Sequence, residues 1–331
     1  MIFNETCDSL PEIPPARRMA FLEGPATAAA HAAALDSLPA FRTLEVSPPP
    51  APPPPPGPLR IAAWNLERGL FPQDSAALLR REGVALTFLT EADCGCHRTG
   101  QRHVTRVMAE ALGQGHAYGA EFLELAAMPA PLPFPENPPG NRLGFHGNGL
   151  LSALPFRAAW LIRLPQEADW FIAPRGGQRR IGARMAVAAL FEWAGVEFLG
   201  CSIHLESDTD FAGRARQMAA LLDALDLLAE GRPVVAGGDL NTRVAPGGLD
   251  DPREALFEEA RRRGYDWAGG NTATASTRAS LWNKGSKVGT QQLDWLFARG
   301  CTLSAPRMTP ALGPDGTPLS DHEMISATLS F

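Results

Sequence analysis

Short apolar runs separated by turn-rich segments dominate the chain from residue 59 onward. LRIAAWN at 59–65 and VALTFLTE at 84–91 are almost wholly apolar, which is typical of buried strands, and 118–125 alternates like a strand with one buried face. Further strand-like runs lie at 148–154, 156–164, 180–193, 196–206, 232–241, 292–298 and 324–331. Helical patterns lie at 73–82, 101–113, 211–230 and 252–263.

The order of these elements predicts the fold class. Strands outnumber long helices, and several strands follow one another directly, as at the turn Ala194–Gly195. Such a series can bury its apolar faces by packing one sheet on another and covering the outer faces with helices. We therefore predict an α/β protein, a four-layer sandwich of two packed, mostly antiparallel sheets flanked by helices.

The first 58 residues have a different composition. PATAAAHAAAL at 25–35 favours a helix, and SPPPAPPPPPGP at 47–58 favours the stiff polyproline II conformation. We predict an N-terminal extension at 1–46, a proline-rich linker at 47–58 and a main domain at 59–331. The linker is interpreted as a tether, with a docking site for a proline-binding partner as the alternative. The sequence leaves open whether residues 1–46 pack on the main domain.

Composition narrows the classes of protein. The 331 residues are 45% hydrophobic and 20% charged, which is enough for a sizeable core. The net charge of −6 argues against a broad basic surface for long nucleic acid, although a local basic groove stays open. Five scattered cysteines do not suggest a disulfide framework. The start of the chain does not resemble a signal peptide, and no apolar run is long enough to span a membrane. A cytoplasmic monomer is expected.

Polar residues gather at the ends of the apolar runs. Strand ends that meet on one edge of a sheet provide a rigid platform for a site. The polar residues at or near these ends are Asn65, Glu91, His204, Asp239, Asn241, Asp294, Asp321 and His322.

The chemistry of these residues suggests a metal and a phosphate. Asp239 and Asn241 would share one strand face, about 6.5–7 Å apart, although an Asx turn after two glycines is the alternative reading. Asn65 and Glu91 offer hard oxygen ligands that suit Mg²⁺ or Mn²⁺, or they serve as caps or surface residues. For His204, a satisfied core histidine is the alternative.

Taken together and in order, these segments resemble the endonuclease/exonuclease/phosphatase superfamily, the metal-dependent phosphoesterases related to pancreatic deoxyribonuclease. The resemblance covers about residues 59–331 and leaves the N-terminal 58 residues outside. It is carried by IAAWNLERG, LTFLTEAD, HGNGLLSALPF, GCSIHLES, VVAGGDLNT, QLDWLFARG and LSDH.

The resemblance implies a metal-binding part of the site. Glu91 would be the principal Mg²⁺ ligand, with Mn²⁺ as the alternative metal, Asn65 beside it and Asp321 at or near the metal. Asp239 would orient or deprotonate the attacking water. Asn241 would hydrogen-bond the phosphate or that water.

The resemblance also implies two histidines that act on the phosphate. His322, braced by Asp294, would stabilise the charge of the transition state. His204 would donate to a phosphate oxygen or to the leaving group. Glu121 would orient His204. A hard cation and two imidazoles supply the charge neutralisation and proton transfer that phosphodiester hydrolysis needs.

Departures from individual branches narrow the activity. A histidine at His204 is absent from the apurinic-site endonuclease branch, and the tryptophan-containing motifs of the inositol-polyphosphate phosphatases are not found. We predict a Mg²⁺-dependent hydrolase of phosphodiester bonds, nuclease-like, with DNA or RNA as candidate partners. Arg102 and Trp282 are candidate substrate-binding residues, although Arg102 could lie on a solvated helix face and Trp282 could pack its loop. A zinc site at the Cys94–Cys96 pair is disfavoured, because two thiolates lack a second pair.

Two alternatives remain. One is a phosphatase or phosphodiesterase acting on a small phospholipid, inositol phosphate or nucleotide, which the negative net charge favours. The other is a non-catalytic scaffold that recruits partners through its proline run. The full set of catalytic residue types argues against the scaffold.

Overall fold

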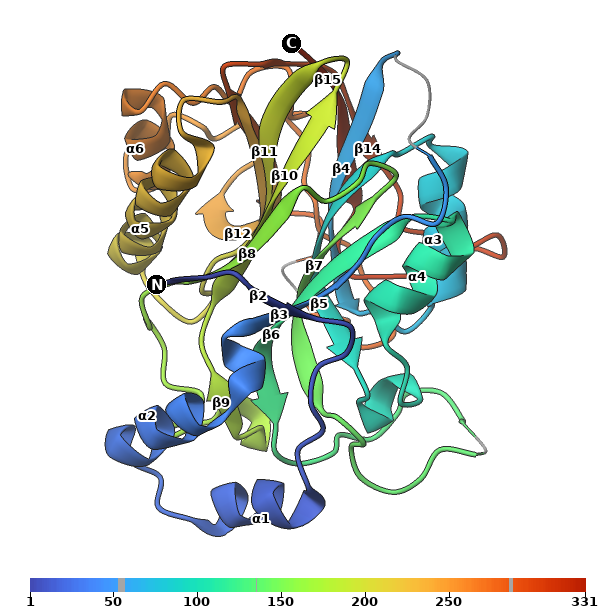
Figure 1. Ribbon diagram of the computed structural model, residues 1–331, viewed down its shortest axis with the longest axis vertical. Coiled ribbons are helices and arrows are strands. Elements are labelled where there is room, and N and C mark those ends of the chain that lie inside the picture. Colours follow the sequence, from blue (N-terminus) through green and yellow to red (C-terminus); the bar gives the residue numbers. More distant parts are fainter. Residues whose placement is uncertain (53–56, 135, 286–287) are drawn as a thin grey trace.

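Two β-sheets pack face to face in the computed structural model of the protein, which describes residues 1–52, 57–134, 136–285 and 288–331 (Figure 1). One sheet has six strands in the order β1 (Ile2–Phe3), β8 (Ala158–Arg163), β10 (Met185–Trp193), β11 (Val196–His204), β12 (Val234–Val244) and β13 (Gln292–Arg299). The other has nine strands: β14 (Thr302–Thr309), β15 (Met324–Ser330), β4 (Leu59–Arg68), β5 (Leu86–Cys94), β7 (Phe145–Ser152), β6 (Gly115–Glu124), β3 (Thr43–Ser47) and β2 (Glu5–Cys7), with β9 (Arg180–Gly182) paired to β6.

Most neighbouring strands in both sheets are antiparallel. The parallel pairs are β4 with β5, β11 with β12 and β2 with β3. Within the first two of these pairs, both strands end on the same side, which brings their polar terminal residues together. The predicted four-layer α/β sandwich is confirmed.

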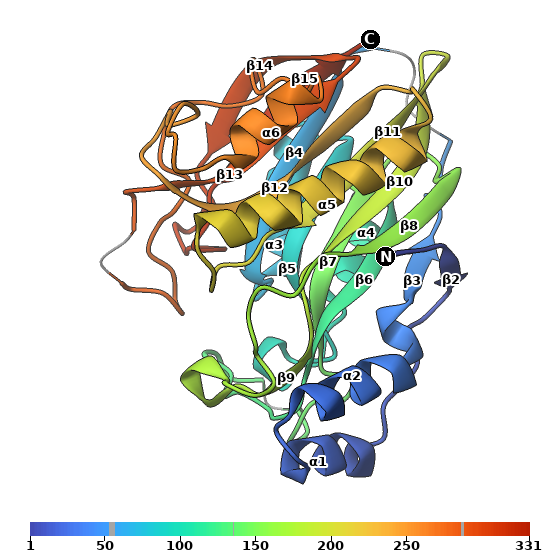
Figure 2. The same ribbon diagram turned by 90° about the vertical axis from the view of Figure 1, so that its left-hand side faces the viewer.

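Helices cover the outer face of each sheet. In Figure 1, α5 (Phe211–Ala229) and α6 (Leu256–Arg262) lie on the left and α3 (Pro72–Arg81) and α4 (Val104–Leu112) on the right, with the sheets between them. Figure 2 shows α5 and α6 crossing the strands of the six-stranded sheet. Apolar side chains from both sheets fill the space between the layers, among them Ile61, Phe88, Val187, Phe198 and Leu296.

The N-terminal segment folds back on the main body, which settles the point that the sequence left open. β1 pairs with β8 of one sheet, while β2 and β3 extend the other. Two helices, α1 (Pro15–Glu23) and α2 (Ala28–Ser37), lie between β2 and β3 in the chain. The family resemblance and the helix propensity of 25–35 gave no hint of these added strands, because two- and three-residue strands carry almost no periodic signal.

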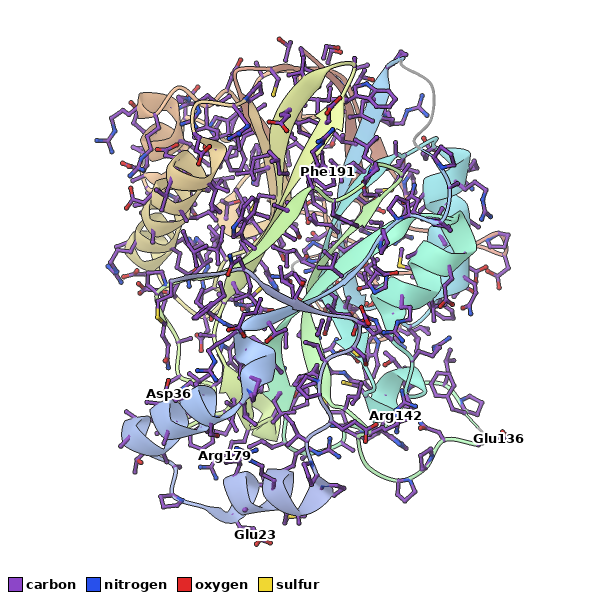
Figure 3. All side chains as sticks on the ribbon, viewed as in Figure 1. Glu23, Asp36, Glu136, Arg142, Arg179 and Phe191 are labelled. Atoms are coloured by element: carbon purple, nitrogen blue, oxygen red, sulfur yellow. The ribbon has the colours of Figure 1, made fainter. Side chains whose placement is uncertain are left out.

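Arginine side chains fasten the N-terminal helices. Arg179 lies next to α1 and α2 in Figure 3 and donates hydrogen bonds to the carbonyls of Leu22 (2.6 Å) and Gly24 (3.1 Å). Its guanidinium lies 4.0 Å from the centre of the Phe171 ring. The same ring stacks on His31 at 5.2 Å. Part of the predicted proline-rich linker, residues 53–56, lies outside the described residues.

Glu45 of β3 ties the N-terminal segment to the sheet. One oxygen of this buried carboxylate accepts from His116 Nε2 (3.0 Å) and Arg106 (2.6 Å) and lies 2.9 Å from His103 Nε2. The side chains of Glu45, His103 and His116 are of types that could hold a metal. However, the amide of Arg106 donates to His103 Nδ1, which leaves the proton on Nε2, facing Glu45. The cluster is therefore a hydrogen-bonded lock that holds the N-terminal segment in place.

None of the helices in the described ranges combines the length and the apolar character that crossing a membrane requires.

Candidate active site

Sheet register places three predicted site residues in one row. His204 of β11 lies opposite Asp239 of β12, and Asp239 lies opposite Asp294 of β13. The other sheet contributes Asn65 from β4 and Glu91 from β5. The Asn65 amide joins the two sheets, because its Nδ2 donates to Glu91 Oε1 at 3.1 Å and to Asp239 Oδ2 at 2.9 Å.

The amide of Asn65 is held in one orientation. Its oxygen accepts the backbone N–H of Glu67 at 2.9 Å, so the nitrogen faces the two carboxylates. In this arrangement Asn65 bridges Glu91 and Asp239. The predicted role of its oxygen as a metal ligand would need the amide turned over.

Irregular backbone aims several of these side chains. Glu91 and Asn241 have left-handed φ angles of 53° and 49°, and each lies where the pairing of its strand shifts register. Such a conformation costs a non-glycine residue roughly 1–2 kcal/mol. Bulges and strain of this kind are common next to active sites, where they direct a side chain away from the regular pleat.

The same irregularity decides between the two readings of Asp239 and Asn241. The N–H of Asn241 donates to Asp239 Oδ1 at 2.8 Å, so the Asx turn is present. The side chain of Asn241 donates to the carbonyl of Leu205 at 3.0 Å. The regular strand face expected for this pair is therefore wrong, because the strand bulges here, yet Asp239 still reaches the site.

His322 is braced as the resemblance implied. Its Nδ1 lies 2.7 Å from Asp294 Oδ2, and its Nε2 lies 3.7 Å from Asp239 Oδ2 and 3.9 Å from Asp321 Oδ1. Burial disfavours the charged ring, but Asp294 and then Asp239 outweigh it and raise the pKa of His322 well above its usual range. His322 is thus set up as a cation facing the centre of the site.

His204 occupies the opposite side of Asp239. Its Nε2 lies 3.7 Å from Asp239 Oδ2 and 3.8 Å from Glu91 Oε1, and its Nδ1 lies 3.3 Å from Glu121 Oε2. Glu121 therefore contacts His204, as expected. Burial and Arg184 disfavour the charged ring, but Glu121 and Asp239 outweigh them and raise the pKa of His204.

The carboxylates of Glu67, Glu91 and Asp321 influence one another electrostatically beside this row. Burial, followed by the charge of Asp321, raises the pKa of Glu67 to about 8. Burial raises the pKa of Asp321 as well, and Glu91 adds to this effect. Carboxylates that repel one another in a buried site fit a divalent cation, since its charge would relieve the repulsion and all three offer hard oxygens. A second group that could hold an ion consists of Glu91, His204 and Asp239.

Glu91 belongs to both groups. Burial opposes its charged form, yet His204, His146 and Arg68 outweigh burial and hold the pKa of Glu91 well below its usual range. Glu91 is therefore anionic and ready to bind a cation. The residues predicted to bind metal lie together, and Glu67 joins them.

Sequence reasoning missed four ionisable residues at or near the site. Glu67 stands two positions after Asn65, and His146 directs Nε2 toward Glu91 at 3.9 Å while its Nδ1 contacts Asp93 at 2.8 Å. Arg184 pairs with Glu121 at 3.2 Å, and Arg68 follows Glu67 directly. Glu67, Arg68 and His146 stand within segments that carried the family resemblance and could have been found by their spacing; Arg184 carries no such signal.

The two predicted substrate-binding residues have different surroundings. The ring of Trp282 packs against Arg68, whose guanidinium lies 4.9 Å from the ring centre. Arg68 in turn lies beside Asp321 and Glu67. Arg102 instead donates to the carbonyls of Leu70 (2.7 Å) and Thr99 (2.8 Å). The expectation that Arg102 reaches an anionic substrate is therefore not supported, because these main-chain contacts occupy its guanidinium.

The comparisons with known proteins identify the family of this chain. Residues 62–322 match the model of the Endonuclease/Exonuclease/phosphatase family, and the chain belongs to this family. Members of the family are phosphoester hydrolases that generally depend on a divalent metal. None of the curated proteins matches the chain.

Solved structures share the fold. An endonuclease/exonuclease/phosphatase from Beutenbergia cavernae is 20% identical, with 83% of this chain and 72% of that chain covered and a TM-score of 0.59. The human Nocturnin catalytic domain with bound sulfate is 16% identical, with 88% and 98% covered and a TM-score of 0.54. D. rerio TDP2 complexed with a single-stranded DNA product is 17% identical, with 83% and 100% covered and a TM-score of 0.54.

Proposed function

We propose that the protein is a Mg²⁺-dependent, nuclease-like phosphodiesterase in which Asp239 activates the attacking water between two histidines. The observation that carries the proposal is the arrangement of Asp239 Oδ2, which lies 3.7 Å from both His204 Nε2 and His322 Nε2. A phosphate placed against this row would meet a base and two proton donors at once. In-line displacement at phosphorus needs these groups together.

Asp239 accepts the proton of the water. Burial raises the pKa of Asp239 and Asp294 adds to this effect, while His322 opposes it. A carboxylate with a raised pKa is a better proton acceptor than an ordinary one. Asn65 holds this carboxylate in place through its hydrogen bond of 2.9 Å.

The two histidines act on the phosphate. His322 is cationic because Asp294 and Asp239 face it, and it stabilises the negative charge that grows on the phosphate oxygens. His204 lies across Asp239 from His322, and it donates a proton to the departing oxygen. Glu121 and Arg184 fix the position of the His204 ring. Asn241 donates or accepts at the phosphate once its amide leaves Leu205.

Glu91, Glu67 and Asp321 would hold the divalent cation, and Mn²⁺ could replace Mg²⁺ there. When bound, the cation supplies neutralisation of phosphate-oxygen charge. Hard oxygen donors favour these two metals over zinc.

The substrate we favour is a nucleic acid strand. TDP2, which shares the fold, is described in complex with a single-stranded DNA product. The aromatic and cationic pair of Trp282 and Arg68 beside the site suits a strand of phosphates and bases. A small phosphodiester or phosphomonoester is the second candidate, which the net charge of −6 supports.

The test is hydrolysis by the purified protein with Mg²⁺. Bis(p-nitrophenyl) phosphate, p-nitrophenyl phosphate, single-stranded DNA and RNA should be compared side by side, together with Glu91→Ala and His322→Ala. We expect turnover of diesters and of a nucleic acid, and loss of most activity in both variants. Faster monoester cleavage would favour the second candidate, and unchanged rates in both variants would refute the mechanism.

A further inference from the structure

Arg68 is a cation beside the carboxylates that we propose to bind the metal, and the hydrogen-bond donors of its guanidinium lack a protein partner in the part of the chain that the structure describes. Among the residues that the structure describes, none accepts a hydrogen bond from this guanidinium, and its Nε is buried. No carboxylate of those residues forms an ion pair with it either. A buried donor without a partner destabilises the protein, because it has lost its hydrogen bonds to water and gained none in return. Such a group in a site calls for an acceptor that arrives with a ligand.

The position of Arg68 is fixed from two directions. Its backbone has a φ of 79° at the point where the pairing of β4 with β5 shifts register, so the chain turns sharply between Asn65 and Gly69. Its guanidinium packs on the Trp282 ring at 4.9 Å. An arginine held by its backbone and by an aromatic face loses little further entropy when it binds an anion.

The loop that carries Trp282 is itself attached to the site. The Ser280 hydroxyl donates to Glu67 Oε1 at 2.7 Å and accepts the N–H groups of Trp282 (3.1 Å) and Asn283 (2.8 Å). The Asn283 side chain donates to Asp321 Oδ2 at 2.9 Å. The indole N–H of Trp282 is also buried without an acceptor among the described residues. Two unpartnered donors thus lie side by side.

The surroundings of Arg68 indicate where it acts. Arg68 directly follows Glu67 at the end of β4, and the loop that carries Trp282 is hydrogen-bonded to Glu67 and Asp321, two of the carboxylates proposed to hold the metal. Arg68 therefore lies on the metal side of the site. An oxyanion bound there would be held by the planar guanidinium and by the indole N–H.

We propose that Arg68 and the Trp282 N–H form an oxyanion subsite that binds non-bridging oxygens of the substrate phosphate. Arg68 touches the substrate, and Trp282 also positions Arg68. This inference rests on the proposed phosphodiesterase function, which it deepens by assigning the groups that recognise the phosphate. The alternative is that Arg68 only balances the charge of the three carboxylates.

Inorganic phosphate is the probe that separates these readings. Its binding to the full chain with saturating Mg²⁺ is measured by calorimetry, and as competitive inhibition of bis(p-nitrophenyl) phosphate hydrolysis. Hydrogen bonds to charged groups contribute about 1.5–3 kcal/mol, so Arg68→Gln should weaken phosphate binding about 10- to 150-fold. Arg68→Lys should recover part of it, because the charge remains while the fork is lost. Arg307→Gln, a change at an exposed arginine paired with Glu82, is the matched control.

Variants of the tryptophan test the positioning role. Trp282→Phe keeps the ring under Arg68 but removes the indole donor, so phosphate should bind several-fold more weakly while Trp282→Ala loses more. A raised KM with a smaller change in kcat is expected for Arg68→Gln on the diester. Phosphate affinity equal to wild type in Arg68→Gln, with Mg²⁺ affinity increased, would overturn the proposal in favour of charge balance. Calorimetry gives this result even if the diester is not hydrolysed, so failure of the proposed function is seen separately.

Discussion

Replacing Asp294 by Asn isolates the pairing that holds His322 as a cation. Asp294 is fully buried, and its Oδ2 lies 2.7 Å from His322 Nδ1. Asparagine has nearly the same shape, so the change removes a charge and leaves the volume of the β13 core unaltered. Its oxygen can still accept the Nδ1 proton, but the amide nitrogen then takes the place of Oδ1, for which none of the described residues offers a hydrogen bond.

The size of the effect follows from the geometry. A hydrogen bond to a charged group contributes about 1.5–3 kcal/mol, and about 1.36 kcal/mol corresponds to a tenfold change in rate. We therefore expect kcat to fall about 10- to 150-fold, with a smaller change in KM. The pH profile should change as well. Asp294 raises the pKa of His322, the cationic ring is the active form below that pKa, and activity is lost as the pH rises through it. Without Asp294 this loss should begin at a lower pH.

Initial rates of bis(p-nitrophenyl) phosphate hydrolysis at saturating Mg²⁺, measured over a range of pH, provide the assay. Asp250→Asn is the control, since the side chain of Asp250 is 94% exposed and pairs with Arg261 on the surface. Thermal unfolding of each variant confirms that the protein remains folded. A folded Asp294→Asn protein with wild-type kcat and an unmoved alkaline limb would refute the role of the Asp294–His322 pair.

Three further predictions concern the metal, the acid stability and the backbone. Glu67→Gln should weaken Mg²⁺ binding in calorimetry about 10- to 100-fold, because Glu67 is one of three carboxylates crowded at the site; unchanged affinity would remove it from the metal site. Burial opposes the charge of Glu45, but hydrogen bonds from two histidines outweigh burial and hold the pKa of Glu45 far below its usual range. The charged Glu45 therefore stabilises the fold above about pH 4.3, and this stabilisation is lost as the pH falls. In urea unfolding, Glu45→Gln should therefore lose about 3–5 kcal/mol at neutral pH and show a flatter decline in acid, whereas curves parallel to wild type at all pH values would contradict this. Gly238→Ala should lower the stability by more than about 2 kcal/mol and reduce kcat, because an added Cβ would lie 2.0 Å from the Ile203 carbonyl oxygen. Gly231→Ala is the control for the backbone cost alone, since Gly231 has a φ of 85° and open space around the Cβ. Equal losses of stability in the two variants would refute the steric argument.

Much of the fold was predictable because apolar strands longer than five residues can be recognised from the apolar pattern of the sequence. Strands β4, β5, β11, β12 and β13 fell where the apolar runs placed them, and helices α3 and α5 followed their periodicity within a few residues. The strands missed were short or irregular. β1 and β2 hold two and three residues, and β14 contains Pro306 and alternates poorly, so their pairing is decided by the sheet edges they meet.

The candidate site was predictable where a residue ends a buried strand. Asn65, Glu91, His204 and Asp239 came together because neighbouring parallel strands end on one side. Arg184 could not be predicted in this way, since it precedes β10 and reaches His204 only through sheet pairing.

Arg102 shows the converse error. Its place after the second strand suggested an anion-binding residue. In the structure, however, the guanidinium of Arg102 donates a hydrogen bond to the carbonyl of Leu70, in a turn that lies next to it. A sequence shows which charges are near a strand end and does not show which carbonyls compete for them. The bulge at Asn241 was likewise hidden, because asparagine fits both a strand end and a left-handed turn.

The most direct test of the account is the position of a bound metal. Crystals soaked in Mn²⁺ and measured near the manganese absorption edge would show the ion as an anomalous peak. The account predicts a peak in contact with Glu91 and at least one of Glu67 and Asp321, within reach of a phosphate that also faces Asp239 and His322. A peak at the Glu45 cluster with none beside Glu91 would contradict it.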